Sequence, residues 1–130
     1  LWPRSKIVAL DVDSDAVATT RENIKLNQVK RQIDCDRSNG YPKKSPNRKT
    51  KFDIIVANIL ADPLFDMAYD SSRWVNKGGF VILSGLLIHQ ERYVLAAFRS
   101  CGLQLFKRQH ISGWSTIILR KSSIRKSAML

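Results

Sequence analysis

A short apolar run that ends on an asparagine constrains the fold of this chain more than any other segment. Residues Ile54 to Ala57 are apolar at consecutive positions, and Asn58 follows them directly. Such a run is typical of a central parallel strand that is covered on both faces. Asp62 and Pro63 then suit a helix start, because aspartate caps helices and the first turn does not need the N–H that proline lacks. The segment predicts a strand, a polar turn and a helix.

A second strand followed by a helix is expected upstream. Residues 6–13 form another mainly apolar run that ends on acidic residues, and Asp13 or Ser14 can cap the helix that follows. In nucleotide-binding α/β folds, an acid at such a strand end accepts hydrogen bonds from ribose hydroxyls. Asp11 is placed for that role. Ligands of open α/β sheets bind outside the carboxyl ends of the strands, so Asn58 is the second candidate.

The remaining sequence continues the alternation of helices and strands. Hydrophobic periodicity predicts helices at 14–29, 63–75 and 88–101, and further strands at 31–35, 80–86, 103–111 and 114–119. Lys77–Gly79 is the expected turn before strand 80–86, and Ser84 and Gly85 lie near the end of that strand. Only Ser112–Gly113 separates the last two strands, so they must be antiparallel. The fold class is α/β, with a doubly wound sheet that ends in an antiparallel hairpin.

Several of these segments together resemble the PrmA family. They are Ala9–Val17, Thr20–Asn23, Val56–Leu64, Gly78–Leu86 and Gly113–Leu119. Members of that family use S-adenosylmethionine to methylate amino groups of large-subunit ribosomal protein eleven. The resemblance reaches to about Lys121 and implies a Rossmann-like, class I methyltransferase fold. The closing hairpin agrees with that class, whereas a nicotinamide-binding domain would more often continue with another helix and parallel strand.

The resemblance also implies roles for particular residues. Asp11 and the neighbouring Val12 would contact the cofactor ribose, and Asn39 lies after the third strand of the family fold, where the adenine is bound. Asn58 would contact both cofactor and substrate. A lysine amine has a reference pKa of about 10.4, so the enzyme must select its neutral form and aim the lone pair at the methyl group. The Asn58 amide oxygen and the Ile59 carbonyl are the expected acceptors for the amine N–H groups.

Family members carry a glycine-rich loop and a first strand upstream of this region, and a separate N-terminal domain that recognises the ribosomal protein. This sequence starts at Leu1, and no G-x-G stretch precedes Asp11. We therefore expect residues 1–121 to be an N-terminally truncated, partial methyltransferase domain that is inactive by itself. Residues 122–130 are expected to be a basic, disordered tail.

Basic side chains outnumber acidic ones by 22 to 11, and many lie at 42–51 and 120–126. These segments predict either solvated loops or a weak contact with ribosomal RNA. Cysteines Cys35 and Cys101 and histidines His89 and His110 have no metal-ligand spacing, so no metal is expected. The two cysteines indicate a reducing, cytoplasmic location, and no apolar run is long enough to predict a membrane span.

Three functions remain open from the sequence. The first is methylation of amino groups on a large-subunit ribosomal protein. The second is methylation of a glutamine or a nucleic-acid base, although such enzymes usually carry Asn-Pro-Pro-aromatic where this chain has Asn58-Ile59-Leu60-Ala61. The third is a non-catalytic remnant that contributes only a basic binding surface.

Overall fold

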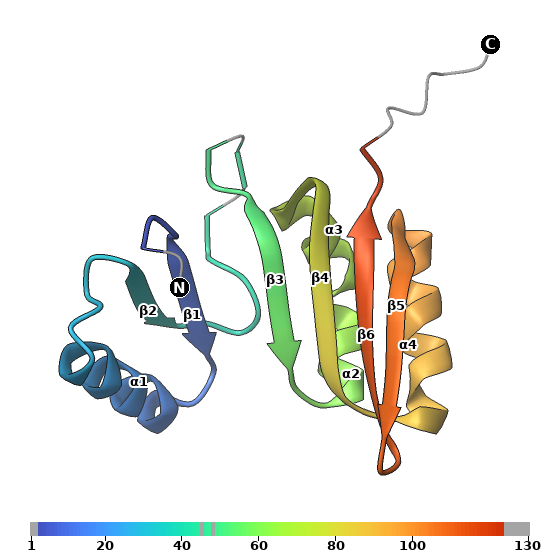
Figure 1. Ribbon diagram of the computed structural model, residues 1–130, viewed down its shortest axis with the longest axis horizontal. Coiled ribbons are helices and arrows are strands. Elements are labelled where there is room, and N and C mark those ends of the chain that lie inside the picture. The colour runs from blue at the N-terminus through green and yellow to red at the C-terminus, as the bar shows by residue number, and fades with distance from the viewer. Residues whose placement is uncertain (1–2, 45, 48, 124–130) are drawn as a thin grey trace. The chain divides into compact units, whose positions relative to one another are not determined.

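The computed structural model describes residues 3–44, 46–47 and 49–123. The chain divides into two compact units, which we call unit 1 (Leu1–Ser45) and unit 2 (Pro46–Leu130). Each unit contains its own small sheet, packed with one helix in unit 1 and with several in unit 2 (Figure 1).

Unit 1 is a strand–helix–strand motif. Its elements are β1 (Ile7–Asp11), α1 (Ser14–Leu26) and β2 (Ile33–Arg37). The two strands pair in parallel, and α1 buries Val17 and Ile24. The helix begins as predicted, because the Asp13 carboxylate accepts a hydrogen bond of 2.9 Å from the backbone N–H of Asp15. It ends at Leu26 rather than at residue 29, since the chain turns through a left-handed residue at Gln28.

In its described residues, unit 2 contains a four-stranded mixed sheet and three helices. Its strands are β3 (Phe52–Asn58), β4 (Val75–Leu87), β5 (Leu103–Ile111) and β6 (Trp114–Lys121). Its helices are α2 (Ala61–Asp66), α3 (Ala68–Trp74) and α4 (Ile88–Ser100). The strand order is β3-β4-β6-β5, with β3 parallel to β4 and both pairings of β6 antiparallel. The predicted closing hairpin is therefore confirmed, and Ser112 and Gly113 both adopt the left-handed conformation that a tight two-residue turn requires.

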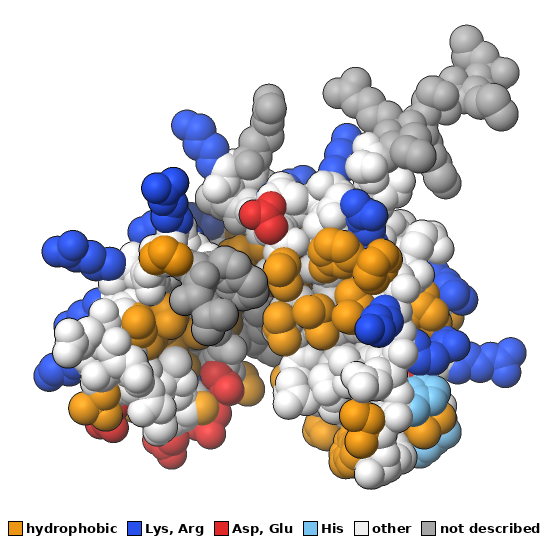
Figure 2. All heavy atoms as spheres, viewed as in Figure 1, with side chains coloured by type: hydrophobic (Ala, Val, Ile, Leu, Met, Phe, Trp, Pro, Cys, Tyr) orange, Lys and Arg blue, Asp and Glu red, His pale blue; other side chains and the backbone are white. Residues whose placement is uncertain are grey.

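The described helices of unit 2 lie on one face of its sheet. Figure 1 shows α2, α3 and α4 on the same side, where the inward residues of the strands form the core. Fully or almost fully buried core side chains are Leu64, Val81, Leu83, Phe98, Leu103, Ile117 and Leu119. Hydrophobic side chains gather on the opposite face, which Figure 2 shows. Val56 and Phe106 lie among the exposed hydrophobic residues of these strands.

The expectation that residues 54–57 form a central strand covered on both faces is wrong for this unit. β3 is an edge strand of its sheet, and its side chains alternate between the two faces. Ile55 and Ala57 are buried against the helices, whereas Ile54 and Val56 are 54% and 67% exposed. The apolar run shows that both faces tolerate hydrophobic residues, but it does not show that both are covered within unit 2.

The single helix predicted at 63–75 is two short helices. The first begins at Ala61, and the chain breaks at Met67 before the second begins at Ala68. Leu60 is the N-cap residue and makes no side-chain capping bond, so the predicted capping role of Asp62 is wrong. Asp62 instead lies within the first turn of α2, as does Pro63.

The turn predicted at Lys77–Gly79 lies inside a longer strand. β4 starts at Val75, which pairs with Phe52, and the next pair joins Phe80 to Ile54. The residues between them form an irregularity in the ladder, and Gly78 there has a φ of +77°. Glycine tolerates this conformation because it has no Cβ, so the strand resumes after the irregularity.

A buried carboxylate fastens α4 to the closing hairpin. Glu91 is 6% exposed, and its Oε1 accepts a hydrogen bond of 2.7 Å from Arg108 Nε. Its Oε2 lies 2.6 Å from His110 Nε2 and accepts a hydrogen bond of 2.6 Å from Ser115 Oγ. Burial by itself would raise the pKa of Glu91, but the hydrogen bonds from His110, Ser115 and Arg108 together lower it below the ordinary value of 4.5.

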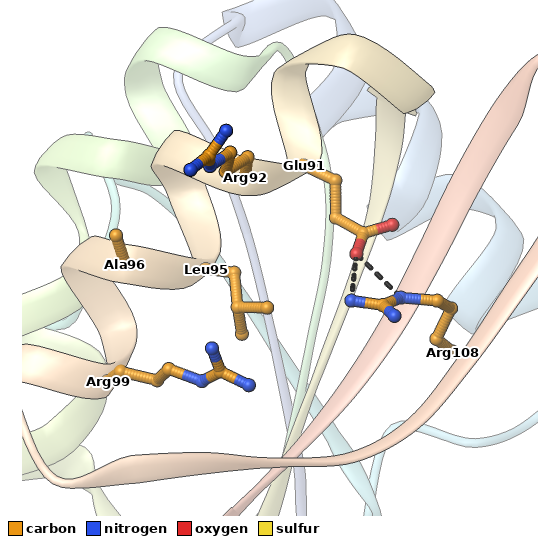
Figure 3. Close-up of a pocket in the computed structure, with 6 residues that line it drawn as sticks. All are labelled: Glu91, Arg92, Leu95, Ala96, Arg99 and Arg108. Carbon is orange, nitrogen blue, oxygen red and sulfur yellow. Dashed lines mark hydrogen bonds and ion pairs between the residues drawn. The ribbon is translucent and has the colours of Figure 1, made fainter.

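Figure 3 shows the Arg108 guanidinium turned toward Glu91 at a pocket of about 600 Å³. Its lining residues are Glu91, Arg92, Leu95, Ala96, Arg99 and Arg108. All of them except Arg108 belong to α4, and Arg108 belongs to β5, so the pocket lies where α4 packs against β5.

Replacing Glu91 by glutamine should lower the free energy of unfolding at neutral pH by about 1–3 kcal/mol, because it removes a charged acceptor from a buried network. The folded-state pKa of Glu91 is lowered, so its contribution is present above the unfolded pKa and is lost as pH falls through the folded value. Urea unfolding of both proteins between neutral and acidic pH should therefore show a difference that narrows below about pH 4.5.

The matched control is Glu22→Gln, which changes an exposed carboxylate on α1 and should have little effect at any pH. If the difference in unfolding free energy between Glu91→Gln and the parent stays constant down to acidic pH, the stabilisation does not come from the ionised Glu91 carboxylate, and the prediction is wrong.

Candidate functional site

The carboxyl end of β3 carries the predicted catalytic residues of unit 2. Asn58 is the last residue of β3 and pairs with Ser84 of the parallel strand β4. Asn58, Ile59 and Leu60 are all exposed, so this end of the sheet is open to a ligand. The structure thus confirms the predicted position of Asn58 at a strand end. Ile59 follows in the short connection to α2.

Two oxygen atoms converge beside Gly85 of β4. A Cβ atom built on Gly85 would lie 2.6 Å from the Ile59 carbonyl oxygen and 3.0 Å from Asn58 Oδ1. Both oxygens therefore lie close to the same side of Gly85. The sequence predicted these two oxygens as acceptors for an amine; the structure shows that both lie beside Gly85, and the acceptor role stays a prediction.

A hydrogen bond between α2 and α4 supports this end of β3. The Tyr93 hydroxyl donates to Asp62 Oδ1 at 2.6 Å, and its ring lies 5.6 Å from that of Phe65. The bond to Asp62 raises the pKa of Tyr93, because ionisation would remove the donated proton beside a carboxylate. Sequence reasoning missed this contact, since the two residues belong to different helices and no local pattern joins them.

The predicted cofactor residues of unit 1 share one end of its two-stranded sheet. Asp11 ends β1 and pairs with Arg37, the last residue of β2, and Asn39 follows in the exposed connection beyond it. Val12 is exposed, and its carbonyl accepts a hydrogen bond of 2.9 Å from Arg37 Nε. The structure therefore brings Asp11, Val12 and Asn39 to the same strand ends within unit 1.

The Asp11 carboxylate fits the recognition of a sugar hydroxyl. Its Oδ1 accepts a hydrogen bond of 2.9 Å from the backbone N–H of Asp13. Its second oxygen has no hydrogen-bond partner within the described part of the chain. One oxygen thus fixes the side chain at the start of α1, while the other is available to accept a hydrogen bond from a ligand.

Other predictions concern the basic segments, metals and membranes. Residues 45 and 48 of the basic loop at 42–51 lie outside the described residues. Residues 124–130 of the tail predicted at 122–130 lie outside them as well. Within residues 3–44, 46–47 and 49–123, no cluster of three His, Cys, Asp or Glu side chains could hold a metal ion. No helix in that part of the chain is long and apolar enough to cross a membrane.

The chain contains parallel strands joined by helices, and polar residues lie at the carboxyl ends of these strands. An antiparallel hairpin closes the chain, as in the class I methyltransferase fold. Among solved structures, a ribosomal protein L11 methylase from Lactobacillus delbrueckii subsp. bulgaricus matches with a TM-score of 0.75 and 26% identity, over 90% of this chain and 58% of that chain. A methyltransferase from Pyrococcus furiosus matches with a TM-score of 0.72 over 90% of this chain and 63% of that chain. At 20% identity, this second likeness shows the fold alone.

The family model described as ribosomal protein L11 methyltransferase (PrmA) matches residues 3–122. A ribosomal protein L11 methyltransferase of Bradyrhizobium diazoefficiens is 40% identical over 88% of this chain, and one of Rhodopseudomonas palustris is 35% identical over 92%. The chain belongs to the ribosomal protein L11 methyltransferase family. It spans 39% and 40% of the lengths of these two relatives. Membership implies S-adenosylmethionine as the methyl donor.

Replacing Asp62 by asparagine should lower the pKa of Tyr93 toward its ordinary value of 10.0, because the charged acceptor of its hydroxyl is lost. Ultraviolet titration of the phenol groups measures this change, and Tyr93→Phe identifies which of the three tyrosine transitions belongs to Tyr93.

Asp66→Asn provides the control, because Asp66 raises the pKa of Tyr93 only through its charge and contributes less than Asp62. Equal effects of the two substitutions would contradict the hydrogen bond as the main cause.

Proposed function

We propose that this chain forms the catalytic part of an S-adenosylmethionine-dependent enzyme that methylates amino groups of a large-subunit ribosomal protein. The observation that carries the proposal is the convergence of Asn58 Oδ1 and the Ile59 carbonyl at the open end of β3. The curated relatives are named as methyltransferases of ribosomal protein L11, which supports a ribosomal protein as the substrate. The free, half-buried thiols Cys35 and Cys101 suit a reducing compartment, and we place the protein in the cytoplasm.

In this proposal, unit 1 contributes the recognition of the cofactor sugar. The available oxygen of Asp11 accepts a hydrogen bond from a ribose hydroxyl, and Val12 and Asn39 lie at the same strand ends to contact the nucleoside. When bound, S-adenosylmethionine supplies a methyl group activated by its positively charged sulfur.

Unit 2 contributes the positioning of the amine. A neutral primary amine has two N–H donors and one lone pair, and methyl transfer requires the lone pair to lie in line with the breaking bond. Asn58 Oδ1 accepts a hydrogen bond from one N–H, and the Ile59 carbonyl accepts one from the other. These two bonds fix the orientation of the amine and therefore the direction of its lone pair. Most of the acceleration then comes from orientation and from removal of water around the nitrogen.

Amide acceptors also explain why a neutral amine is favoured. A carboxylate at this position would stabilise the protonated amine and raise its pKa, whereas an asparagine oxygen and a backbone carbonyl carry no net charge. The exposed strand end allows a side chain on another protein to reach both oxygens.

Activity tests use a hybrid enzyme, in which this chain replaces the matching part of the Bradyrhizobium diazoefficiens relative. Methylation of ribosomal protein L11 by the folded hybrid is the direct test of the proposed function. A folded hybrid that binds the cofactor and the ribosomal protein but transfers no methyl group would contradict it.

In the hybrid enzyme, Asp11→Ala should weaken cofactor binding by about 1–3 kcal/mol, because a ribose hydroxyl loses its charged partner. Asp11→Asn retains an oxygen for the Asp13 N–H and removes only the charge, so its effect should be smaller. Calorimetric titration measures both. Unchanged affinity in a correctly folded Asp11→Ala variant would assign this residue to the Asp13 turn alone.

Asn58→Ala in the hybrid enzyme should reduce turnover by roughly 10- to 100-fold, because the amine loses one of its two orienting acceptors. Cofactor affinity should change less than turnover. Single-turnover methylation at saturating cofactor, measured beside cofactor binding, separates the two effects. Leu60→Ala is the control, since it truncates a highly exposed neighbour and keeps both acceptors. Transfer at the parent rate by Asn58→Ala would show that this asparagine only shapes the turn.

A further inference from the structure

We infer that Gly85 is a positioning residue for methyl transfer, because its missing side chain sets the positions of Asn58 Oδ1 and the Ile59 carbonyl. This inference rests on the proposed function and goes beyond it by assigning the geometry of the two acceptors to a residue on a different strand. Gly85 makes no contact with substrate in this account and acts only through the two oxygens beside it.

The first observation is a bulge in β4. Leu83 pairs with Ile117 and Leu86 pairs with Ser115, so β4 contains one more residue than β6 between these two pairs. Gly85 lies in this interval with a φ of +82°. A glycine in the left-handed region is the usual residue of such a bulge, and bulges next to active sites redirect the backbone. The bulged interval also contains Ser84, the partner of Asn58 in the parallel ladder.

The second observation is the closeness of the backbone at this bulge. A Cβ on Gly85 would lie 2.6 Å from the Ile59 carbonyl oxygen, 3.3 Å from the Ile59 carbonyl carbon and 3.0 Å from Asn58 Oδ1. The Ile59 atoms belong to the backbone and cannot rotate away like the end of a flexible side chain. Any residue with a side chain at position 85 must therefore displace the connection after β3, the Asn58 amide or both.

Other glycines of unit 2 separate the possible causes of a substitution effect. Gly113 has a φ of +84° but nothing within 4 Å of its Cβ position, so Gly113→Ala introduces the same kind of backbone strain without a collision. At Gly79, a Cβ would lie 2.8 Å from the Asp53 carbonyl oxygen near the beginning of β3. Gly79→Ala therefore introduces a comparable collision between β4 and the β3 backbone at residues other than the two acceptors.

The first test measures geometry in the chain as it is. In nuclear magnetic resonance spectra, Gly85→Ala should shift the side-chain amide signals of Asn58 and the backbone amide of Leu60, which shares its peptide group with the Ile59 carbonyl. Gly113→Ala should leave both sets of signals in place. Unchanged Asn58 and Leu60 signals in folded Gly85→Ala would overturn the inference, because the added methyl group would then displace neither acceptor.

The second test measures catalysis in the hybrid enzyme. Gly85→Ala should lower kcat by roughly 10- to 100-fold, with the cofactor Kd and the KM for the ribosomal protein changed much less, because only the alignment of a bound amine is altered. Gly113→Ala and Gly79→Ala should keep the parent kcat, whatever they do to thermal stability. Gly85→Asn carries the same Cβ with less strain, because asparagine tolerates the left-handed region, and it replaces Gly85→Ala where that variant is too unstable.

A double substitution distinguishes this inference from the proposed function itself. If Gly85 acts through Asn58, Gly85→Ala should reduce kcat less in the Asn58→Ala background than in the parent, since one of its targets is already absent. A large effect of Asn58→Ala with parent turnover in folded Gly85→Ala would overturn the inference and leave the proposed function intact. Parent turnover in Asn58→Ala would instead contradict the proposed function.

Discussion

Parallel pairing between β3 and β4 is the constraint on which the candidate site of unit 2 depends. The ladder runs without interruption from Ile54 paired with Phe80 to Asn58 paired with Ser84. Burial of Val81 and Leu83 against the helices holds β4 in place, so the register of β3 follows from a packed core. A shift of one residue would turn Asn58 to the other face and bury Val56 in place of Ala57. Correct register therefore determines both the core and the chemistry.

The helix α4 links the closing hairpin to α2, the helix that follows the connection after β3. On one side, Glu91 joins it to the closing hairpin through Arg108, His110 and Ser115. On the other side, Tyr93 joins it to α2 through Asp62. The Glu91 carboxylate is buried, so few water molecules compete for its partners, and this contact favours one arrangement of α4 over others. The Tyr93–Asp62 bond is exposed and adds a second, weaker link. The Ile59 carbonyl thus lies in a connection whose following helix is held at a defined position.

Local pattern in the sequence predicted the features that arise from neighbouring residues. The strand ending at Asn58, the Asp13 cap and the hairpin at Ser112–Gly113 each follow from a few adjacent side chains, and the structure confirms them. The break at Met67 and the Glu91 network depend on contacts between distant elements, and no local pattern reveals such contacts. Gly85 was visible as an isolated glycine in an apolar strand, a pattern that indicates a bulge or a close backbone approach. The atoms that Gly85 approaches lie on a different strand and its connection, so only the folded structure identifies them.

The most direct measurement of the central claim is a crystal structure of the hybrid enzyme with S-adenosylhomocysteine and a peptide from the ribosomal protein that carries the target amine. The account predicts that the amine nitrogen lies within hydrogen-bonding distance of both Asn58 Oδ1 and the Ile59 carbonyl oxygen. The lone pair of this nitrogen should point toward the sulfur of the cofactor product. An amine held by other groups, with the Asn58 side chain bonded to its own backbone, would contradict the account.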